Sequence, residues 1–250
     1  QDKNRIGWDA LNDVIAIIPA RSGSKGVPDK NIMNLYGYPL LEWSINAAKN
    51  SNLIDRVFVS TDSQKYADLA VEFGAEAPFL RPKEISGDLS SDLDFVLHAL
   101  REFKNLHLDP KYIAHIRPTT PLRESPVIDQ AIEFFKMNPD YTSLRSVHKM
   151  SESAYKTFEI SNDILMPLSD KMHSDLDSNA PRQLFPETFQ ANGYIDILSV
   201  EFLNSSNSLH GKKILPFITN HSYEIDSYED FRMLEYQAKF SHDIITKLFE

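Results

Sequence analysis

Residues 14–31 have the sequence VIAIIPARSGSKGVPDKN, in which five apolar residues lead into a polar loop. The run from Val14 to Ile18 is rich in β-branched side chains and ends at Pro19, which is typical of a strand buried on both faces of a parallel sheet. The loop that follows carries glycines and basic side chains. We therefore expect a ligand-binding loop after the first strand, because open α/β sheets bind ligands at the carboxyl ends of their strands.

The same alternation of strand and helix continues outward from this segment. Pro39 precedes a helical pattern whose inward positions are Leu40, Leu41, Trp43, Ile45 and Ala47. Further strands are predicted at 56–60, 75–79, 111–116 and 141–147, and helices at 63–73, 92–103 and 125–137. This spacing predicts an α/β fold with a doubly wound, mostly parallel sheet.

The regular alternation of predicted strands and helices stops after Val147. Residues 148–190 are polar and contain prolines, with only a weak strand at 156–160, so we interpret them as an insertion. Strands are expected again at 193–200 and 213–218, and one helix over 228–248. We accordingly divide the chain into a polar N-terminal extension (1–12), an α/β core (13–147), the insertion (148–190) and the remainder of the core (191–250).

Composition narrows the function further. The 250 residues suit one α/β domain with an insertion. A net charge of −10 argues against nucleic-acid binding, because an acidic surface repels phosphate backbones. The absence of cysteine excludes disulfides, zinc–thiolate sites and a cysteine nucleophile, and fits a reducing compartment. We find neither a membrane-spanning apolar run nor a secretory signal, and we expect a cytoplasmic protein.

The loop after the first strand has the chemistry of a phosphate-binding site. Gly23 and Gly26 let backbone N–H groups approach phosphate oxygens, and Arg21, Lys25 and Lys30 supply positive charge. The glycine order fits neither the P-loop nor the dinucleotide fingerprint. On glycine and charge alone, a solvated basic turn remains the alternative.

The loop resembles the signature of the CMP-sialic acid synthetases, or acylneuraminate cytidylyltransferases, and the Kdo cytidylyltransferases carry a variant of it. Further segments follow in the family's order: VSTD at 59–62, LRP at 80–82, RPTTPLR at 117–123, PRQ at 181–183, NG at 192–193 and ID at 225–226. The resemblance covers residues 13–240. It implies a fold of the nucleotide-diphospho-sugar transferase type. It also implies a reaction in which the anomeric hydroxyl of an acidic sugar attacks the α-phosphorus of CTP.

The resemblance also implies roles for individual residues. The implied catalytic residues are Arg21, Lys30 and Asn31. The implied nucleotide-binding residues are Ala20, Arg21, Ser22, Gly23, Ser24, Lys25, Lys30, Arg81, Ser90 and Asp92. The implied sugar-binding residues are Arg117, Thr119, Lys156, Arg182, Gln190, Asn192 and Asp196. Residues 148–190 correspond to the family's dimerisation segment, which implies a homodimer whose insertion reaches the neighbouring sugar site.

A metal site is expected near the chain's end. Glu224 and Asp226 alternate along an extended segment, so both carboxylates are predicted to point to one side. By resemblance they bind the cofactor Mg²⁺, although the family has Asp-Ile-Asp here. A solvated acidic loop is the alternative, because Glu229 and Asp230 follow. The eight histidines show no metal-ligand spacing.

Three positions depart from the sialic acid enzymes. The family has Gln where Arg117 stands, Arg where Gln190 stands, and a pocket Tyr where Asp196 stands. A polar pocket discriminates strongly between substrates, so we expect an acceptor other than N-acetylneuraminate: a diamino nonulosonic acid, the deaminated form or an octulosonic acid.

Two alternatives remain open. One is a cytidylyltransferase for another acceptor, Kdo or a phosphonate. The other is a catalytically silent nucleotide-binding module excised from a longer protein, which the missing initiator methionine suggests. A Rossmann dehydrogenase is disfavoured, because its glycine fingerprint is absent.

Overall fold

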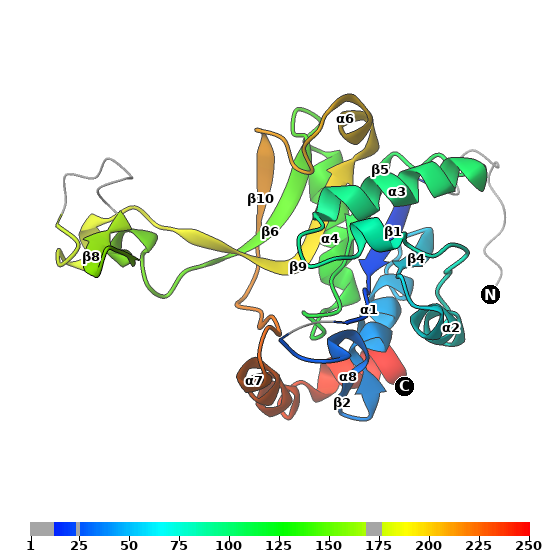
Figure 1. Ribbon diagram of the computed structural model, residues 1–250, viewed down its shortest axis with the longest axis horizontal. Helices are drawn as coiled ribbons and strands as arrows, with labels where there is room; N and C mark the ends of the chain where they lie inside the picture. The colour runs from blue at the N-terminus through cyan, green and yellow to red at the C-terminus, as the bar shows by residue number, and fades with distance from the viewer. Residues whose placement is uncertain (1–12, 24–25, 169–176) are drawn as a thin grey trace.

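A single six-stranded sheet forms the centre of the protein, whose computed structural model describes residues 13–23, 26–168 and 177–250. The strand order is β10-β6-β9-β5-β1-β4 (Figure 1). These strands span Ile214–Ile218, Ser143–Lys149, Phe189–Ser199, Tyr112–His115, Val14–Pro19 and Arg56–Ser60, respectively. β1 is parallel to β4 and β5, and β6 is parallel to β10, whereas β9 is antiparallel to both of its neighbours. The predicted, mostly parallel α/β sheet is confirmed.

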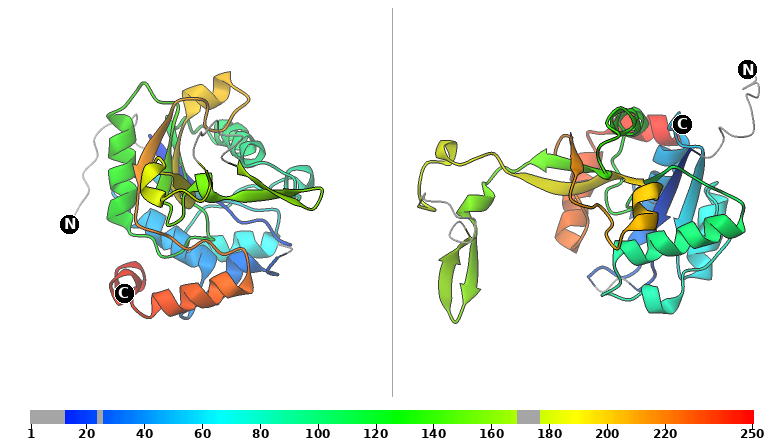
Figure 2. Two further views of the ribbon diagram at one scale, coloured as in Figure 1. Left: turned by 90° about the vertical axis from the view of Figure 1, so that its left-hand side faces the viewer. Right: turned by 90° about the horizontal axis from the view of Figure 1, so that it is seen from above.

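Helices cover both faces of the sheet, because β1 is apolar on both. Val14, Ala16 and Ile18 join one buried cluster, and Ile15 and Ile17 join the other. The first cluster packs against α1 (Leu40–Lys49), α2 (Gln64–Glu72), α4 (Ser125–Lys136), α7 (Tyr228–Ala238) and α8 (His242–Phe249). The second packs against α3 (Asp92–Asn105) and α6 (Val200–Ser205). Figure 2 shows the two layers of helices around the sheet, which is therefore doubly wound.

Two predicted elements were wrong. The strand expected at 75–79 is only a single bridge between Phe58 and Glu76. The helix expected over 228–248 is two helices, because the chain turns between Ala238 and His242. That turn returns the last helix to the core, where Phe249 stacks on Tyr38 with ring centroids 3.6 Å apart. Burial of this aromatic side chain outweighs the continuation of one helix. The N-terminal extension, 1–12, lies outside the described residues.

Short elements complete the core. They are η1 (Lys30–Ile32), β2 (Asn34–Leu35), β3 (Tyr38–Pro39) and η2 (Lys83–Ile85). Across the parts of the chain that the structure covers, no helix is both long enough and apolar enough to pass through a bilayer.

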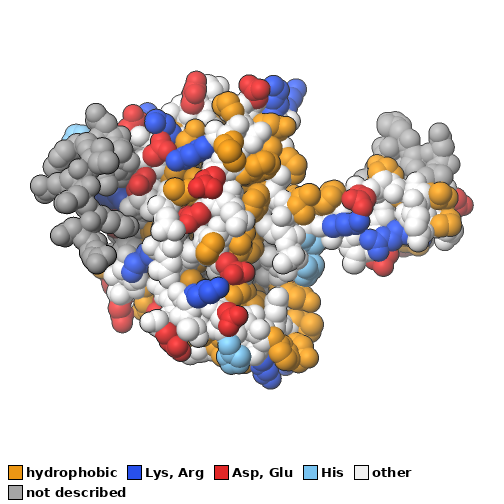
Figure 3. Space-filling model, turned by 180° about the vertical axis from the view of Figure 1, so that it is seen from behind, with side chains coloured by type: hydrophobic (Ala, Val, Ile, Leu, Met, Phe, Trp, Pro, Cys, Tyr) orange, Lys and Arg blue, Asp and Glu red, His pale blue; other side chains and the backbone are white. Residues whose placement is uncertain are grey.

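The described part of residues 148–190 projects from the body as an arm (Figures 1 and 2). It contains η3 (Ala154–Lys156), η4 (Arg182–Leu184) and a hairpin of β7 (Phe158–Ser161) and β8 (Ile164–Pro167), of which β8 was not expected. Apolar side chains remain on its surface (Figure 3), and the exposed ones include Phe158, Ile160, Ile164 and Leu165. The described residues of the insertion thus contribute to neither buried apolar cluster, and they leave apolar area exposed.

A buried arginine fixes the turn that follows β5. Arg123 is fully buried and donates from Nε to the carbonyl of Tyr194 at 2.6 Å. Its other nitrogens reach the carbonyls of Arg117 and Gly193 and the hydroxyl of Ser44. Backbone and hydroxyl oxygens thus solvate this cation in place of water, and they tie the turn to β9 and α1.

Replacing Arg123 with Met should lower the free energy of unfolding by about 3 kcal/mol or more, because buried carbonyls lose their donors. Urea unfolding monitored by circular dichroism measures this loss. The exposed Arg232 on α7 offers a matched control, since Arg232→Met removes a solvated guanidinium. A loss below about 1 kcal/mol in Arg123→Met would contradict a structural role for this network.

Candidate functional site

A cavity of about 430 Å³ opens where the carboxyl ends of β1, β4 and β5 meet. Backbone hydrogen bonds bring the strand ends together: Ala20 donates to Ser60 at 2.9 Å, and Ile116 donates to Ile17 at 3.1 Å. The lining residues are Pro19, Arg21, Gly26, Lys30, Asn31, Arg81, Gly87, Asp88, Ser90, Ser91, Asp92, Phe95, Arg117, Pro118, Thr119 and Asp226. Most of the residues predicted for catalysis and nucleotide binding that the structure describes therefore lie in one place.

The loop after β1 is anchored at both ends. The amide and hydroxyl of Ser22 donate to Asp62 at 2.7 and 2.9 Å. Asn31 is buried and donates from Nδ2 to the carbonyl of Arg21 at 3.0 Å, so its side chain holds the loop in shape. The guanidinium of Arg21 pairs with Asp88 at 2.8 Å across the cavity. Ser24 and Lys25, both predicted to bind nucleotide, lie outside the described residues.

The predicted metal-binding segment, residues 224–226, lies against this loop. Lys30 Nζ donates to the carbonyl of Ile225 at 2.6 Å and contacts the carboxylate of Asp226 at 3.2 Å. Gly26 allows the approach, because a Cβ there would lie 2.8 Å from the Asp226 carbonyl oxygen. The Asp226 side chain is 79% exposed and lines the cavity. Glu224 instead accepts a hydrogen bond from Thr119 at 3.1 Å.

One wall of the cavity combines a buried cation with the start of α3. Arg81 donates to the hydroxyl and the carbonyl of Ser60 and lies 4.6 Å from the centre of the Phe95 ring. Burial lowers the pKa of Arg81 to about 10, so it remains charged at neutral pH. Ser90 and Asp92 lie beside the capping box that Ser91 forms at the helix start.

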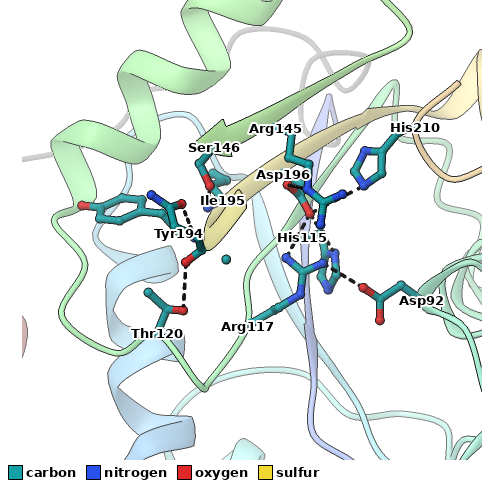
Figure 4. Close-up of polar contacts among 12 residues, drawn as sticks. Asp92, His115, Arg117, Thr120, Arg145, Ser146, Tyr194, Ile195, Asp196 and His210 are labelled. Carbon is teal, nitrogen blue, oxygen red and sulfur yellow. Dashed lines mark hydrogen bonds and ion pairs between the residues drawn. The ribbon is translucent and has the colours of Figure 1, made fainter. Parts of the chain in front are cut away.

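A buried charge cluster forms the floor between β5 and β9 (Figure 4). Arg117 Nη1 contacts Asp196 at 3.0 Å, and Nη2 contacts Asp92 at 2.8 Å. Burial would raise the pKa of Asp92, but positive charge including that of Arg117 holds it below its usual value. For Arg117, burial works against the charge, but Asp196 and Asp92 raise the pKa. Asp92 and Arg117 therefore stay ionised together.

Further side chains surround Asp196. Arg145, His115 and His210 lie 3.8, 3.7 and 3.9 Å from its oxygens. Burial lowers the pKa of His115 to about 3, despite the nearby acids, so the ring is neutral. Sequence reasoning missed the two histidines and Arg145, because no spacing relates these distant strand positions to a common cluster.

Several residues predicted to bind sugar lie away from the cavity. Lys156, Arg182 and Gln190 belong to the arm, where Lys156 Nζ donates to the Ala180 carbonyl and Arg182 to the Met150 carbonyl. No described residue of 148–190 lines the cavity. Asn192 is buried and donates to the Thr219 hydroxyl at 2.6 Å.

Asp196 also lies away from the opening. Its side chain is 1% exposed and sits behind Arg117, whereas Arg117 and Thr119 do line the cavity. Of the predicted sugar-binding set, a single chain therefore brings two members into the cavity wall. A second, separate cavity of about 440 Å³ lies in the arm, beside Lys149, Arg182 and Glu187.

Comparison with known proteins places the chain among nucleotidyltransferases. A family model described as "Cytidylyltransferase" matches residues 15–220. An N-acylneuraminate cytidylyltransferase from Escherichia coli is 32% identical over 225 residues, which cover 88% of this chain and 51% of that protein. A CMP-N,N'-diacetyllegionaminic acid synthase from Legionella pneumophila is 28% identical over 225 residues, covering 89% of this chain and 94% of that protein.

A solved structure shares the fold. A structure of CMP:2-keto-3-deoxy-manno-octonic acid synthetase complexed with CTP superimposes with a TM-score of 0.68 at 13% identity, covering 91% of this chain and 99% of that one. The chain spans about half the length of the Escherichia coli relative and nearly the whole Legionella protein.

The buried His115 should make stability fall in mild acid. Below pH 6.5 the unfolded chain binds a proton that the folded chain excludes down to about pH 3. The free energy of unfolding should therefore drop as pH falls below 6.5, by up to about 1.4 kcal/mol per pH unit from this residue.

His115→Gln should flatten this slope between pH 6.5 and 5, as urea midpoints at each pH will measure. The exposed His242 on α8 supplies the control, because His242→Gln should keep the wild-type slope. Parallel pH profiles for wild type and His115→Gln would show that His115 titrates alike in both states.

Proposed function

Because the chain belongs to the cytidylyltransferase family, we propose that it transfers CMP from CTP to an acidic 2-keto-3-deoxy sugar and releases pyrophosphate. The observation that carries this proposal is the convergence of Arg21, Lys30 and Asp226 in one cavity at the carboxyl end of β1. Two cations beside an exposed carboxylate suit a nucleoside triphosphate that carries a metal ion. The names of the relatives support an acceptor of the nonulosonic class.

The chain's own residues would act by positioning and by stabilising charge. Arg21 and Lys30 face the cavity and would bind phosphate oxygens, where negative charge builds up as pyrophosphate leaves. Asn31 holds the carbonyl of Arg21 and so fixes the loop's curvature. The anomeric hydroxyl of the sugar would attack the α-phosphorus, and the bond to the departing pyrophosphate would break.

The residues present fit Mg²⁺ as the cofactor. This ion takes oxygen ligands and commonly uses only one or two protein carboxylates, with phosphates and waters supplying the rest. Asp226 offers such a carboxylate in the cavity, and Glu224 lies two residues before it. Among the described residues, no group of three or more acidic, histidine or cysteine side chains is arranged to hold a metal ion, so a metal site made of protein ligands alone has no support there. When bound, Mg²⁺ would neutralise phosphate charge.

The acceptor we favour is a nonulosonic acid other than N-acetylneuraminate. Arg117, Gln190 and Asp196 all differ from the sialic acid enzymes in charge. The Legionella relative is named for a diacetylated legionaminic acid, and this chain covers nearly all of it.

We further propose that the active form is a homodimer in which the arm completes the partner's sugar site. Lys156 and Arg182 lie on the arm, outside their own chain's cavity. The arm projects from the body and exposes apolar side chains, as a surface that packs against a second copy would.

The proposal predicts Mg²⁺-dependent pyrophosphate release from CTP in the presence of one acidic sugar. A coupled assay should compare four nucleoside triphosphates and a panel containing diacetylated nonulosonic acids, N-acetylneuraminate, its deaminated form and Kdo. EDTA should abolish turnover. CTP binding without turnover on any sugar would favour a silent binding module, and turnover with N-acetylneuraminate alone would exclude the altered acceptor.

Sharing of sites between subunits predicts complementation. Lys30→Ala should lower kcat/KM by about 100-fold or more, because a cation is lost from the phosphates, and Arg182→Ala should also impair turnover. Refolding the two variants together should restore part of the activity, since mixed dimers contain one intact site. Lys65→Ala, at an exposed position on α2, should keep wild-type rates. Monomers in light scattering, or no recovery in the mixture, would contradict the shared site.

A further inference from the structure

The charge cluster below the cavity runs from the buried sheet to the surface. Asp196 has a side chain that is 1% exposed, that of Arg117 is 16% exposed, and that of Asp92 is 41% exposed. Each side chain contacts the next through one guanidinium nitrogen (Figure 4). The contacts thus form a chain from the centre of β9 to the cavity wall.

The buried end of this series of contacts, at Asp196, is held rigidly. Asp196 lies on β9 opposite His115 of β5 and Arg145 of β6, where sheet pairing fixes its backbone. The backbone of Arg117 is fixed as well, because its carbonyl accepts from Arg123 at 3.0 Å. The guanidinium therefore has one anchored carboxylate behind it, which sets the direction of its second contact.

The guanidinium of Arg117 already contacts two carboxylates. Nη1 donates to Asp196 and Nη2 donates to Asp92, so the positive charge is balanced before any ligand enters. An anionic group of the substrate placed here would meet the carboxylate of Asp92 rather than a free cation. The group that fits this position donates a hydrogen bond, as a hydroxyl or an amino group does.

The position of Asp92 favours the nucleoside as the donor. Asp92 lies on the same wall as Ser90 and Phe95, and the preceding Asp88 contacts Arg21 of the phosphate loop at 2.8 Å. A nucleotide whose phosphates lie at Arg21 and Lys30 would extend along this wall. Its hydroxyl and amino groups, and not its phosphates, would then reach Asp92.

Building on the proposed function, we propose that Asp196 is a positioning residue that acts through Arg117 to hold the Asp92 carboxylate as a hydrogen-bond acceptor for the nucleoside of CTP. On this account Arg117 is not the partner of the sugar's carboxylate. That partner must be another cation.

A double-mutant cycle tests the chain of contacts. Calorimetry with CTP and Mg²⁺ should compare the full wild-type chain with Asp92→Asn, Asp196→Asn and the double variant. Each single change should weaken CTP binding about tenfold, as expected for one charge-assisted hydrogen bond, and the double variant should bind no more weakly than Asp92→Asn. Unchanged binding in Asp196→Asn, or losses that multiply in the double variant, would overturn the proposal.

Two further variants separate positioning from stability. Arg145→Gln removes another cation, which lies 3.8 Å from Asp196 but makes no direct ion pair with Asp92 (Figure 4). This variant should bind CTP within about twofold of wild type. Arg117→Lys keeps the charge but offers one nitrogen in place of the two that contact Asp92 and Asp196, so it should reproduce the loss even if Asp196→Asn fails to fold. Equal losses in Arg145→Gln and Asp196→Asn would also overturn the proposal.

The same experiment distinguishes this inference from the function on which it rests. A wild-type chain that binds CTP but turns over no sugar contradicts the proposed acceptor and leaves the cycle interpretable. A wild-type chain that binds no CTP contradicts both.

Discussion

Complete burial of β1 is the constraint on which the rest of the structure depends. Every residue from Val14 to Ile18 is fully buried, so both faces of the strand require a layer of helices. Polar groups can then gather only where the strand ends. The buried strand fixes the position at which the loop after Pro19 begins. The carboxyl ends of β4 and β5 lie beside this loop because both strands pair in parallel with β1. The cavity is a consequence of this pairing.

Charge in the site is balanced in an acidic protein by pairing each cation with a nearby oxygen. Lys30 meets a carbonyl and a carboxylate, Arg21 meets Asp88, and Arg81 meets Ser60. Arg117 is balanced by acids on two elements that lie far apart in the sequence. Asp226 and Asp88, which pair with Lys30 and Arg21, have side chains that are 79% and 32% exposed, so the proposed triphosphate and metal ion could replace these contacts. Asp196, which contacts Arg117, is only 1% exposed, so replacing that contact would leave a buried carboxylate without its cation.

The residues proposed to bind the triphosphate and those proposed to bind the sugar lie on different parts of the chain. The core holds the groups suited to a triphosphate, whereas Lys156 and Arg182 lie on a projection whose described residues do not line the chain's own cavity. A two-stranded hairpin with exposed apolar residues has little stability by itself. Packing against another surface would bury its apolar side chains and stabilise it. The proposed shared site between two copies would account for both features.

Much of this protein could be predicted from the sequence, because the deciding patterns are local. The apolar run at 14–18, the polar loop after it and the helical periodicity of 92–103 and 125–137 predict the α/β fold and the edge of the sheet where the cavity lies. The resemblance of the loop to cytidylyltransferases is confirmed by the match over residues 15–220.

The tertiary structure alone decided which distant side chains meet. Strand β9 inserts antiparallel between β5 and β6, which puts Asp196 behind Arg117 and next to Arg145. The turn after α7 depends on the burial of Phe249 against α1 and β3, and no local signal encodes that contact. Periodicity reports the environment of each residue along its own element, whereas strand order and the pairing of buried charges are set by packing among elements remote in the chain.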